Sequence, residues 1–233
     1  MELLKEDLYW CIKRLPKDVV SLLSNKQRQL FVAGGFIRAC IANEKPNDID
    51  LFSPSKDIAE LCARTLAGGK YQFLSTDNAF TVFGKGRLSV QFIHKWTFEN
   101  PTDVLPSFDF TIAKAVLWSE KKEWGSLCDD RFYPDLAAKR LTYCSPKRIE
   151  EVGGSMLRVL KFYQRGYRIP LDSLGAVIAR IMTGIDMNKL PGESNEETWA
   201  IVLSGLLREV DPQIDPNHIA HLPNSKGESW KRR

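Results

Sequence analysis

The sequence predicts an α+β fold in which a small mixed β-sheet is flanked by helices and followed by a helical C-terminal region. Residues 30–42 hold a short apolar run, a Gly34-Gly35 turn and apolar residues at helical spacing, so a strand should lead through the turn into a helix. Alternating residues over 71–94 predict a hairpin. From residue 149 onward the apolar spacing is helical instead. Strands gathered early and helices gathered late are typical of α+β chains.

Spacing and turn residues predict the other elements in order. Residues 3–24 predict one or two short helices, and Ser55 should cap a helix over 56–67 that ends at Gly68-Gly69. The residues expected to be buried in that helix are Ile58, Leu61, Cys62 and Leu66. Further strands are predicted at 48–52, 71–75, 79–84, 87–94, 107–118 and 124–128, and further helices at 149–165, 171–185 and 195–210.

An acidic pair stands in the predicted strand 48–52. Residues two apart in a strand face the same way, so Asp48 and Asp50 should project from one face while Ile49 and Leu51 enter the core. Two parallel carboxylates repel each other unless a cation lies between them, and hard oxygen ligands near phosphate suit Mg²⁺. A solvated strand edge is the simpler alternative for this pair.

The glycine turn is a second candidate site. Gly34 and Gly35 lack a Cβ, so a ligand can approach the backbone, and the N–H groups that begin a helix favour an anion such as phosphate. By itself, however, a Gly-Gly pair after a strand is more often only a turn.

A lone acid, Asp109, interrupts the apolar run at 107–118, which predicts a buried strand. An unpaired acid in such a place is costly unless it is paired or binds a metal. Asp109 therefore predicts either a metal ligand or an acceptor of hydrogen bonds from a neighbouring loop or from Arg38.

Together, GGFIR at 34–38 and NDIDLF at 47–52 resemble the signature of the polymerase-β-like nucleotidyltransferase superfamily. They are most similar to the head domain of class II tRNA nucleotidyltransferases and bacterial poly(A) polymerases, and FDFTI at 108–112 resembles the second motif of these enzymes. The resemblance implies that three acids are catalytic and bind Mg²⁺, namely Asp48, Asp50 and Asp109. It implies that the nucleoside triphosphate is held by Gly34, Gly35 and Arg38.

The chain departs from the family pattern at several positions. Gln91 stands where an acidic residue is expected on the second hairpin strand, and Ser107 and Phe108 stand where the second motif has two arginines. Ala39 replaces an aspartate of the first motif. Glutamine is a poor Mg²⁺ ligand, so these departures support the alternative of a catalytically weakened module. The retained pair of Asp48 and Asp50 favours an active enzyme instead, because a binding module has no reason to keep two acids that repel each other.

The predicted helix 149–165 resembles the D-P-L-R-x-L-R stretch of the family, with Arg158 and Lys161 at the two arginines. We therefore expect these two side chains to bind nucleotide or RNA phosphate, although a solvated basic face is the simple alternative. Arg165 lies on the same face. The apolar stripe of this helix is predicted to consist of Val152, Met156, Leu160 and Tyr163.

The resemblance implies a nucleotidyltransferase head at residues 1–145, followed by a helical neck-like region and polar tail at 146–233. It implies transfer of a nucleoside monophosphate from a triphosphate to an acceptor hydroxyl, most simply an RNA 3′ end. The alternatives are a regulatory module that binds nucleotide or RNA, or a transferase that modifies a protein or small molecule. No match to the base-selecting E-D-x-x-R motif or to the tRNA-gripping body of the family follows, which leaves the acceptor open.

Composition excludes few partners. The net charge of +4 permits RNA or free nucleotides without requiring either. The five scattered cysteines predict reduced thiols rather than disulfides or a zinc site. No apolar run has the length of a membrane span, and the N-terminus carries acids where a signal peptide has basic residues. We therefore expect a cytoplasmic protein with no membrane partner.

Overall fold

The computed structural model describes residues 1–25, 27–120, 123–146, 153–185 and 196–210, with side chains described up to residue 204. Its strands are β1 (Phe31–Ala33), β2 (Asp48–Phe52), β3 (Gln72–Ser75), β4 (Ala79–Phe83), β5 (Ser89–Ile93), β6 (Ala115–Glu120) and β7 (Glu123–Cys128). Its α-helices are α1 (Lys5–Arg14), α2 (Lys17–Leu23), α3 (Gly35–Ile41), α4 (Lys56–Ala67), α5 (Phe132–Ala137), α6 (Gly154–Gln164), α7 (Leu171–Thr183) and α8 (Glu196–Val210). Two 3₁₀ helices, η1 (Pro101–Ser107) and η2 (Thr111–Ala113), precede β6.

The described strands form one mixed sheet in the order β3-β4-β5-β2-β1-β6-β7. β2 and β5 are parallel, with Asp48 beside Ser89 and Asp50 beside Gln91, and the other neighbours are antiparallel. β2 and β5 can be parallel because α4 and the β3–β4 hairpin, which lie between them in the chain, return it to the end of the sheet at which β2 begins. The prediction of a mixed sheet with flanking helices is confirmed.

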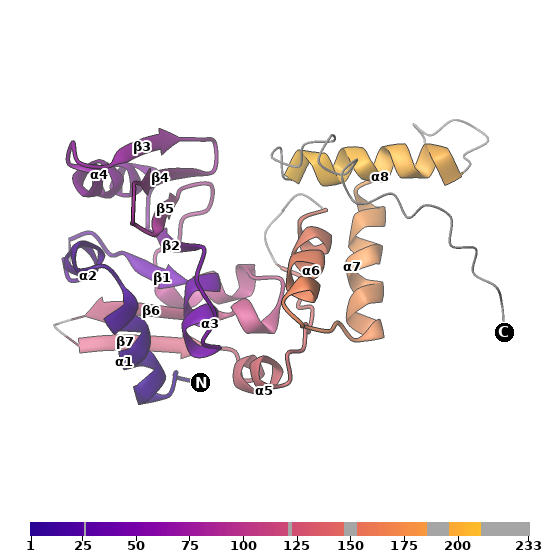
Figure 1. Ribbon diagram of the computed structural model, residues 1–233, viewed down its shortest axis with the longest axis horizontal. Helices are drawn as coiled ribbons and strands as arrows, with labels where there is room; N and C mark the ends of the chain where they lie inside the picture. The colour runs from indigo at the N-terminus through magenta and orange to yellow at the C-terminus, as the bar shows by residue number, and fades with distance from the viewer. Residues whose placement is uncertain (26, 121–122, 147–152, 186–195, 211–233) are drawn as a thin grey trace.

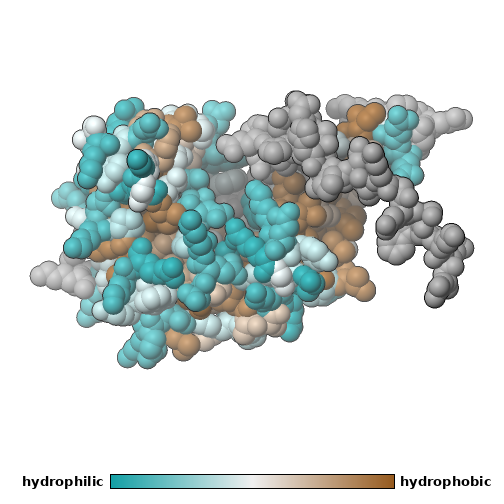
Figure 2. Space-filling model, viewed as in Figure 1, coloured by the Kyte–Doolittle hydropathy of each residue, from teal (hydrophilic) through white to brown (hydrophobic). Residues whose placement is uncertain are grey.

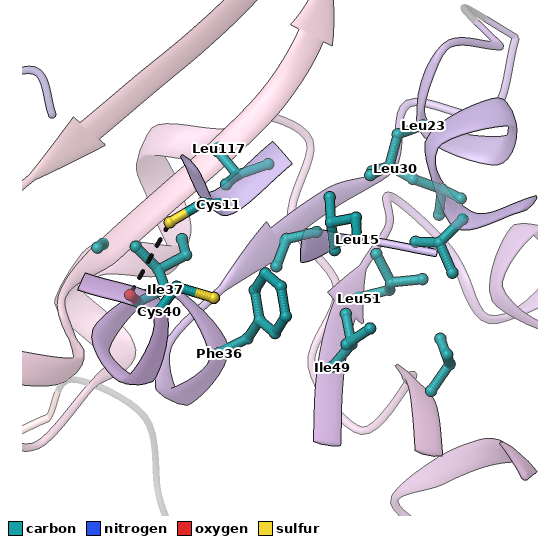
Figure 3. Close-up of a cluster of buried hydrophobic side chains, with 14 of the residues drawn as sticks. Cys11, Leu15, Leu23, Leu30, Phe36, Ile37, Cys40, Ile49, Leu51 and Leu117 are labelled. Carbon is teal, nitrogen blue, oxygen red and sulfur yellow. Dashed lines mark hydrogen bonds between the residues drawn. The ribbon is translucent and has the colours of Figure 1, made fainter. Parts of the chain in front are cut away.

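One face of this sheet packs against helices. Ile49 and Leu51 of β2 are 0% and 1% exposed, and they join the main core cluster with Phe36 of α3 and Leu15 beside α1 (Figure 3). Helix α3 is held further by Cys11, whose thiol donates to the carbonyl of Ile37. Since side chains alternate along a strand, the burial of Ile49 and Leu51 directs the acids of β2 to the other face.

The second face carries a smaller apolar cluster. It consists of Phe31, Ala33, Phe52, Val104 and Val116, which come from β1, β2, η1 and β6. Phe52 has the same strand parity as Asp48 and Asp50, so these three residues share this face. The candidate site therefore begins where the smaller cluster ends.

The C-terminal helices lie to one side of the sheet, with α8 running across the ends of α6 and α7 (Figure 1). Hydrophilic residues cover most of the sheet part of the face shown in Figure 2, whereas hydrophobic residues gather over α7. Ile178 and Met182 of α7 are 46% and 42% exposed. Among the described residues, no helix is both long and apolar enough to span a membrane.

The predicted strand over 107–118 is partly wrong. Its second half is β6, but Asp109 lies in a bend between η1 and η2. The backbone there pairs with a later segment instead of a strand, since Cys144 N–H donates to the Asp109 carbonyl and Thr111 N–H donates to the Thr142 carbonyl. The apolar residues of this stretch are buried as expected, but not in a strand.

The predicted apolar stripe of the 149–165 helix is also wrong. Val152 lies outside the described residues, while Leu160 and Tyr163 are 53% and 57% exposed. The buried face of α6 instead includes Ser155 and Val159, which are 2% and 5% exposed. The helix is rotated because Ser155 binds a buried acid, a polar contact that an apolar repeat cannot reveal. Leu61 of α4, predicted to be buried, is likewise 59% exposed, although Ser55 caps that helix as expected.

Candidate functional site: an acidic strand facing a basic helix

The acidic pair lies at the start of β2. Both Asp48 and Asp50 are half-buried and point away from the main core. On the adjacent parallel strand, Gln91 Nε2 donates a long hydrogen bond of 3.5 Å to Asp48 Oδ2. Burial raises the pKa of the Asp48 carboxyl above its ordinary value, and the charges of Arg165 and Lys161 oppose that shift. The two carboxylates are thus held in a partly desolvated place that faces cations.

A cleft of about 320 Å³ opens in front of this pair. Its size lies within the range of small-molecule sites. It brings together most of the site residues predicted from sequence. The residues that line it are Gly35, Arg38, Asn47, Asp48, Asp50, Phe52, Ile93, Trp96, Phe108, Asp109, Ala113, Arg158, Lys161, Phe162 and Arg165.

Helix α6 supplies the basic wall of the cleft. Arg158, Lys161 and Arg165 line the side that faces β2, as their three- and four-residue spacing predicts. Arg165, at the C-terminal end of α6, also lies with its guanidinium 5.8 Å from the ring centre of Phe162. Arg165 was not predicted to bind nucleotide, although the sequence places it on the same basic face as Arg158 and Lys161.

Asp109 is bound to α6. Its Oδ2 accepts hydrogen bonds from Ser155 Oγ at 2.9 Å and from an Arg158 guanidinium nitrogen at 2.5 Å, and the residue is 3% exposed. The bend that carries Asp109 is fixed from behind, because Thr111 Oγ1 donates to the fully buried carboxylate of Asp135 at 2.7 Å. Asp109 therefore lies in the cleft as an acceptor of hydrogen bonds. The expected donors were wrong, because these two bonds come from α6 and not from a neighbouring loop or from Arg38, which pairs with Glu44.

Arg38 lines the cleft from α3 but is 3% exposed. One guanidinium nitrogen forms an ion pair with Glu44 and donates to the Tyr167 hydroxyl at 3.3 Å, and the guanidinium lies 5.0 Å from the ring centre of Phe162. Burial opposes the effect, but the bonds from Arg38 and then from Tyr167 hold the pKa of Glu44 below its ordinary value. Within the described part of the chain, Arg38 Nε is buried and makes no hydrogen bond.

The two glycines of the turn differ. Gly34 has a φ of +82°, and a Cβ there would lie 3.0 Å from the Phe108 ring, so the residue must be glycine for reasons of backbone and packing alone. A Cβ on Gly35 would meet nothing within 4 Å, and Gly35 lines the cleft. A ligand can therefore reach the backbone at Gly35, as predicted for the turn, whereas the Phe108 ring covers the backbone at Gly34.

Several lining residues were not foreseen as site residues. Phe52, Phe108, Ile93 and Trp96 form an apolar side of the cleft, and Phe108 meets Phe52 edge to face with ring centres 6.3 Å apart. Strand parity places Phe52 beside the acids, so that signal was present in the sequence. Trp96 lies beyond the end of β5, in a loop whose path no local pattern predicts.

The donors available for a metal are few. No group of three or more acidic, histidine or cysteine side chains suited to a metal ion occurs among the described residues. Asp48 and Asp50 remain as paired hard oxygen donors, and Gln91 offers a neutral amide beside them. This donor set fits a hard divalent cation such as Mg²⁺, which commonly takes one or two carboxylates together with substrate phosphates.

A mixed sheet with paired acids on one strand and a helical region beyond it defines a protein with the nucleotidyltransferase head fold. Solved structures with this fold include the Thermotoga maritima CCA-adding enzyme complexed with tRNA, at a TM-score of 0.55 and 19% identity over 85% of this chain and 53% of that one. A CCA-adding enzyme in complex with CTP has a TM-score of 0.56 and 19% identity, over 91% and 52% of the two chains. The resemblance to the polymerase-β-like head, predicted from the motifs, is confirmed for the fold.

The chain belongs to the Gabija anti-defense 2 family, whose model matches residues 2–139. A curated relative, Gabija anti-defense 2 of Bacillus phage SPbetaL7, is 29% identical over 156 residues. That match covers 66% of this chain and 37% of the relative, so the chain spans little more than a third of the relative's length. The chain also spans about half of the CCA-adding enzymes. The family match includes β2 and Asp109 but ends before α6.

Proposed function

We propose that this protein binds a nucleoside triphosphate with Mg²⁺ and transfers the nucleoside monophosphate to an acceptor hydroxyl. One observation carries the proposal: the acids of β2 and the cations of α6 face each other across one cleft. A triphosphate with a bound divalent cation has the complementary charges, negative toward α6 and positive toward β2. We propose that this occurs in the cytoplasm, where free cysteines stay reduced.

The reaction forms a bond from the acceptor oxygen to the α-phosphorus, breaks the bond from that phosphorus to pyrophosphate, and releases the hydroxyl proton to water. Mg²⁺, when bound by Asp48 and Asp50, supplies a charge that stabilises the oxygens at the reacting phosphorus. Lys161 and Arg165 offset the charge that grows on the departing pyrophosphate. The unbonded Nε of buried Arg38 and the open backbone at Gly35 are further donors toward phosphate.

The apolar side of the cleft has a different task. The rings of Phe52, Phe108 and Trp96 offer a surface on which a nucleobase can stack, which tolerates any base because every base has a π-face. They also lower the local dielectric, so that charge interactions in the cleft are stronger than in water. This wall supports nucleotide binding without selecting a particular base.

For the acceptor, we propose an RNA 3′ hydroxyl. Membership of the Gabija anti-defense 2 family favours a second candidate, a hydroxyl on a component of the Gabija defence system. In both cases the transfer would act against defence by altering the acceptor. A protein that binds and retains nucleotide without transfer is the third candidate, favoured by the amide of Gln91 beside the acids.

The test is incubation of the protein with each α-labelled triphosphate, Mg²⁺ and either total RNA or purified Gabija components. Asp48→Ala and Asp50→Ala should each lower label transfer by on the order of 10²- to 10³-fold, since charge stabilisation is usually the largest contribution in such sites. The melting temperature should stay equal or rise slightly, because repulsion between the two acids is relieved.

The matched control is Asp57→Ala, which removes an exposed acid from the first turn of α4, a helix that packs with Ile49 and Leu51 in the main core cluster. Label transfer by this variant should equal that of the wild type. Full transfer by both β2 variants, or marked destabilisation by both, would refute the catalytic role and indicate a structural one.

A further inference from the structure

The third side chain on the acidic face is an amide. β2 and β5 are parallel with Asp50 and Gln91 as direct neighbours, so their side chains lie on the same face of the sheet. The bond from Gln91 Nε2 to Asp48 Oδ2 places this amide within reach of both acids. A neutral side chain therefore occupies the place where a third carboxylate could share ions with Asp48 and Asp50.

Asp109 is a poor substitute for that third carboxylate. Its Oδ2 already accepts from Ser155 and Arg158, and Arg158 balances its charge. Buried ion pairs are costly to break, because each charge is then left without its partner in a desolvated place. Ligation of a metal by Asp109 would require that Arg158 give up this contact.

We propose that Gln91 limits the cleft to one divalent cation per bound nucleoside triphosphate, and that it thereby makes the transfer slow. The inference rests on the proposed function and concerns the same site. A cation held by Asp48 and Asp50 gains further ligands from the phosphates. A second cation would need a further charged oxygen of the protein, whereas the Gln91 amide carries no charge and donates its N–H to Asp48.

The consequence for chemistry follows from charge. Two-ion sites stabilise both the attacking and the leaving oxygen of an in-line displacement. A single ion held by Asp48 and Asp50 would supply only one of these two stabilising charges. The cleft should then bind nucleotide well while activating the acceptor poorly.

The experiment counts ions and does not depend on turnover. Mn²⁺ replaces Mg²⁺, a non-hydrolysable α,β-methylene triphosphate is the nucleotide, and bound Mn²⁺ per chain is measured by electron paramagnetic resonance titration. We expect about one ion for the wild type and about two for Gln91→Glu, whose carboxylate restores a third charged ligand. Label transfer by Gln91→Glu should rise at least about tenfold.

Thr81→Glu is the matched control. Thr81 is the partner of Gln91 on β4, so this variant adds the same charge on the same face one strand further from the acids. It should bind about one ion. A second ion in Thr81→Glu would show that added charge alone recruits metal, and it would overturn the role assigned to Gln91.

The wild-type count tests the inference even if Gln91→Glu fails to fold. Two ions in the wild type would overturn the inference and leave the proposed function standing. If Asp109→Asn then lowers that count to one, Asp109 is the third ligand, as the sequence motif implies. Absence of both nucleotide and Mn²⁺ binding in the wild type would overturn the proposed function itself. A Gln91→Glu protein that folds and still binds one ion would also refute the inference.

Discussion

At the scale of single residues, Arg38 both lines the cleft and stabilises the packing between α3 and the C-terminal part of the chain. The sequence motif implies a triphosphate ligand, and Arg38 does line the cleft. The structure also places it in a buried ion pair with Glu44 and against Tyr167, a residue beyond α6 that is 0% exposed. Arg38 therefore links the sheet to the C-terminal helices, and its removal would disturb packing as well as any ligand.

This pair gives a prediction for stability against pH. Because the folded-state pKa of Glu44 is lowered, the pair stabilises the fold above the ordinary glutamate pKa of about 4.3 and loses that effect as the pH falls through the lower folded-state value. Glu44→Gln should cost about 1–3 kcal/mol near pH 7, because the buried Arg38 guanidinium loses its ionised partner while Glu44 itself is partly exposed to solvent. The gap in melting temperature between wild type and variant should shrink on acidification, as measured by circular dichroism from pH 7 to pH 3.

The matched control is Glu60→Gln, since Glu60 forms an exposed i,i+4 ion pair with Arg64 in α4. Exposed pairs contribute little to stability, so its melting temperature should follow the wild type at every pH. A constant gap for Glu44→Gln over the whole pH range would show that the ionised carboxylate is not the source of stability.

Residue-level prediction from sequence succeeds where local geometry decides and fails where distant contacts do. Strand alternation is local, so the outward direction of Asp48 and Asp50 follows from the apolar residues between and after them. Arg38, by contrast, donates to the hydroxyl of Tyr167, which lies 129 residues away in the chain. Ser155 lies 46 residues from Asp109 in the chain, and only the fold shows that its hydroxyl donates to that carboxylate.

At the scale of elements, the two glycines of the turn between β1 and α3 have different roles: Gly34 is required for packing, and Gly35 leaves the backbone open to a ligand. Gly34→Ala should lower stability by roughly 1–3 kcal/mol, because a positive φ is strained for alanine and its Cβ would meet the Phe108 ring. Gly35→Ala should leave stability unchanged or slightly raised, since the position is helical and nothing lies within 4 Å of the new Cβ. Thermal melting checks both expectations.

Nucleotide binding should be affected by Gly35→Ala, the variant that keeps its stability. A methyl group on Gly35 enters the cleft, so triphosphate affinity should fall in a protein of normal stability. Equal affinity for Gly35→Ala and wild type would argue that the phosphates lie elsewhere in the cleft.

Element types were more predictable than their orientation. Most helices and strands lie near their expected positions because apolar spacing and caps such as Ser55 determine them. The facing of α6 was not predictable, since it is set by the bond between Ser155 and Asp109 and not by an apolar stripe. The bend at Asp109 was missed because its backbone partners at 142–144 come much later in the chain.

At the scale of the whole molecule, the chain has a head with the fold of CCA-adding enzymes but spans about half their length. We predict little preference for intact tRNA over an oligonucleotide of its acceptor end. Among the described residues, the motifs assign the cleft to nucleotide or RNA, and no motif assigns a tRNA-binding surface beyond the cleft. RNA binding should weaken as salt rises, since each phosphate contact releases counterions. Competition between the two RNAs at matched salt measures the preference.

Strong selectivity for whole tRNA would contradict this expectation and would point to a tRNA-reading surface within residues 171–233. Triphosphate consumption with no RNA binding at all would indicate that the acceptor is a component of the Gabija system or a small molecule. The division into domains at residue 145 also stays a prediction, which limited proteolysis would address.

The contacts that complete the cleft join residues that are far apart along the chain. Asp48 meets Gln91 across 43 positions, Asp109 meets Ser155 across 46, and Arg38 meets Tyr167 across 129. Contacts of such sequence separation form slowly, because loop-closure entropy opposes them until other structure exists. The helices and hairpins of this protein should therefore form before its cleft does, and a chain still emerging from the ribosome would have no nucleotide site until α6 and Tyr167 have been made and have docked.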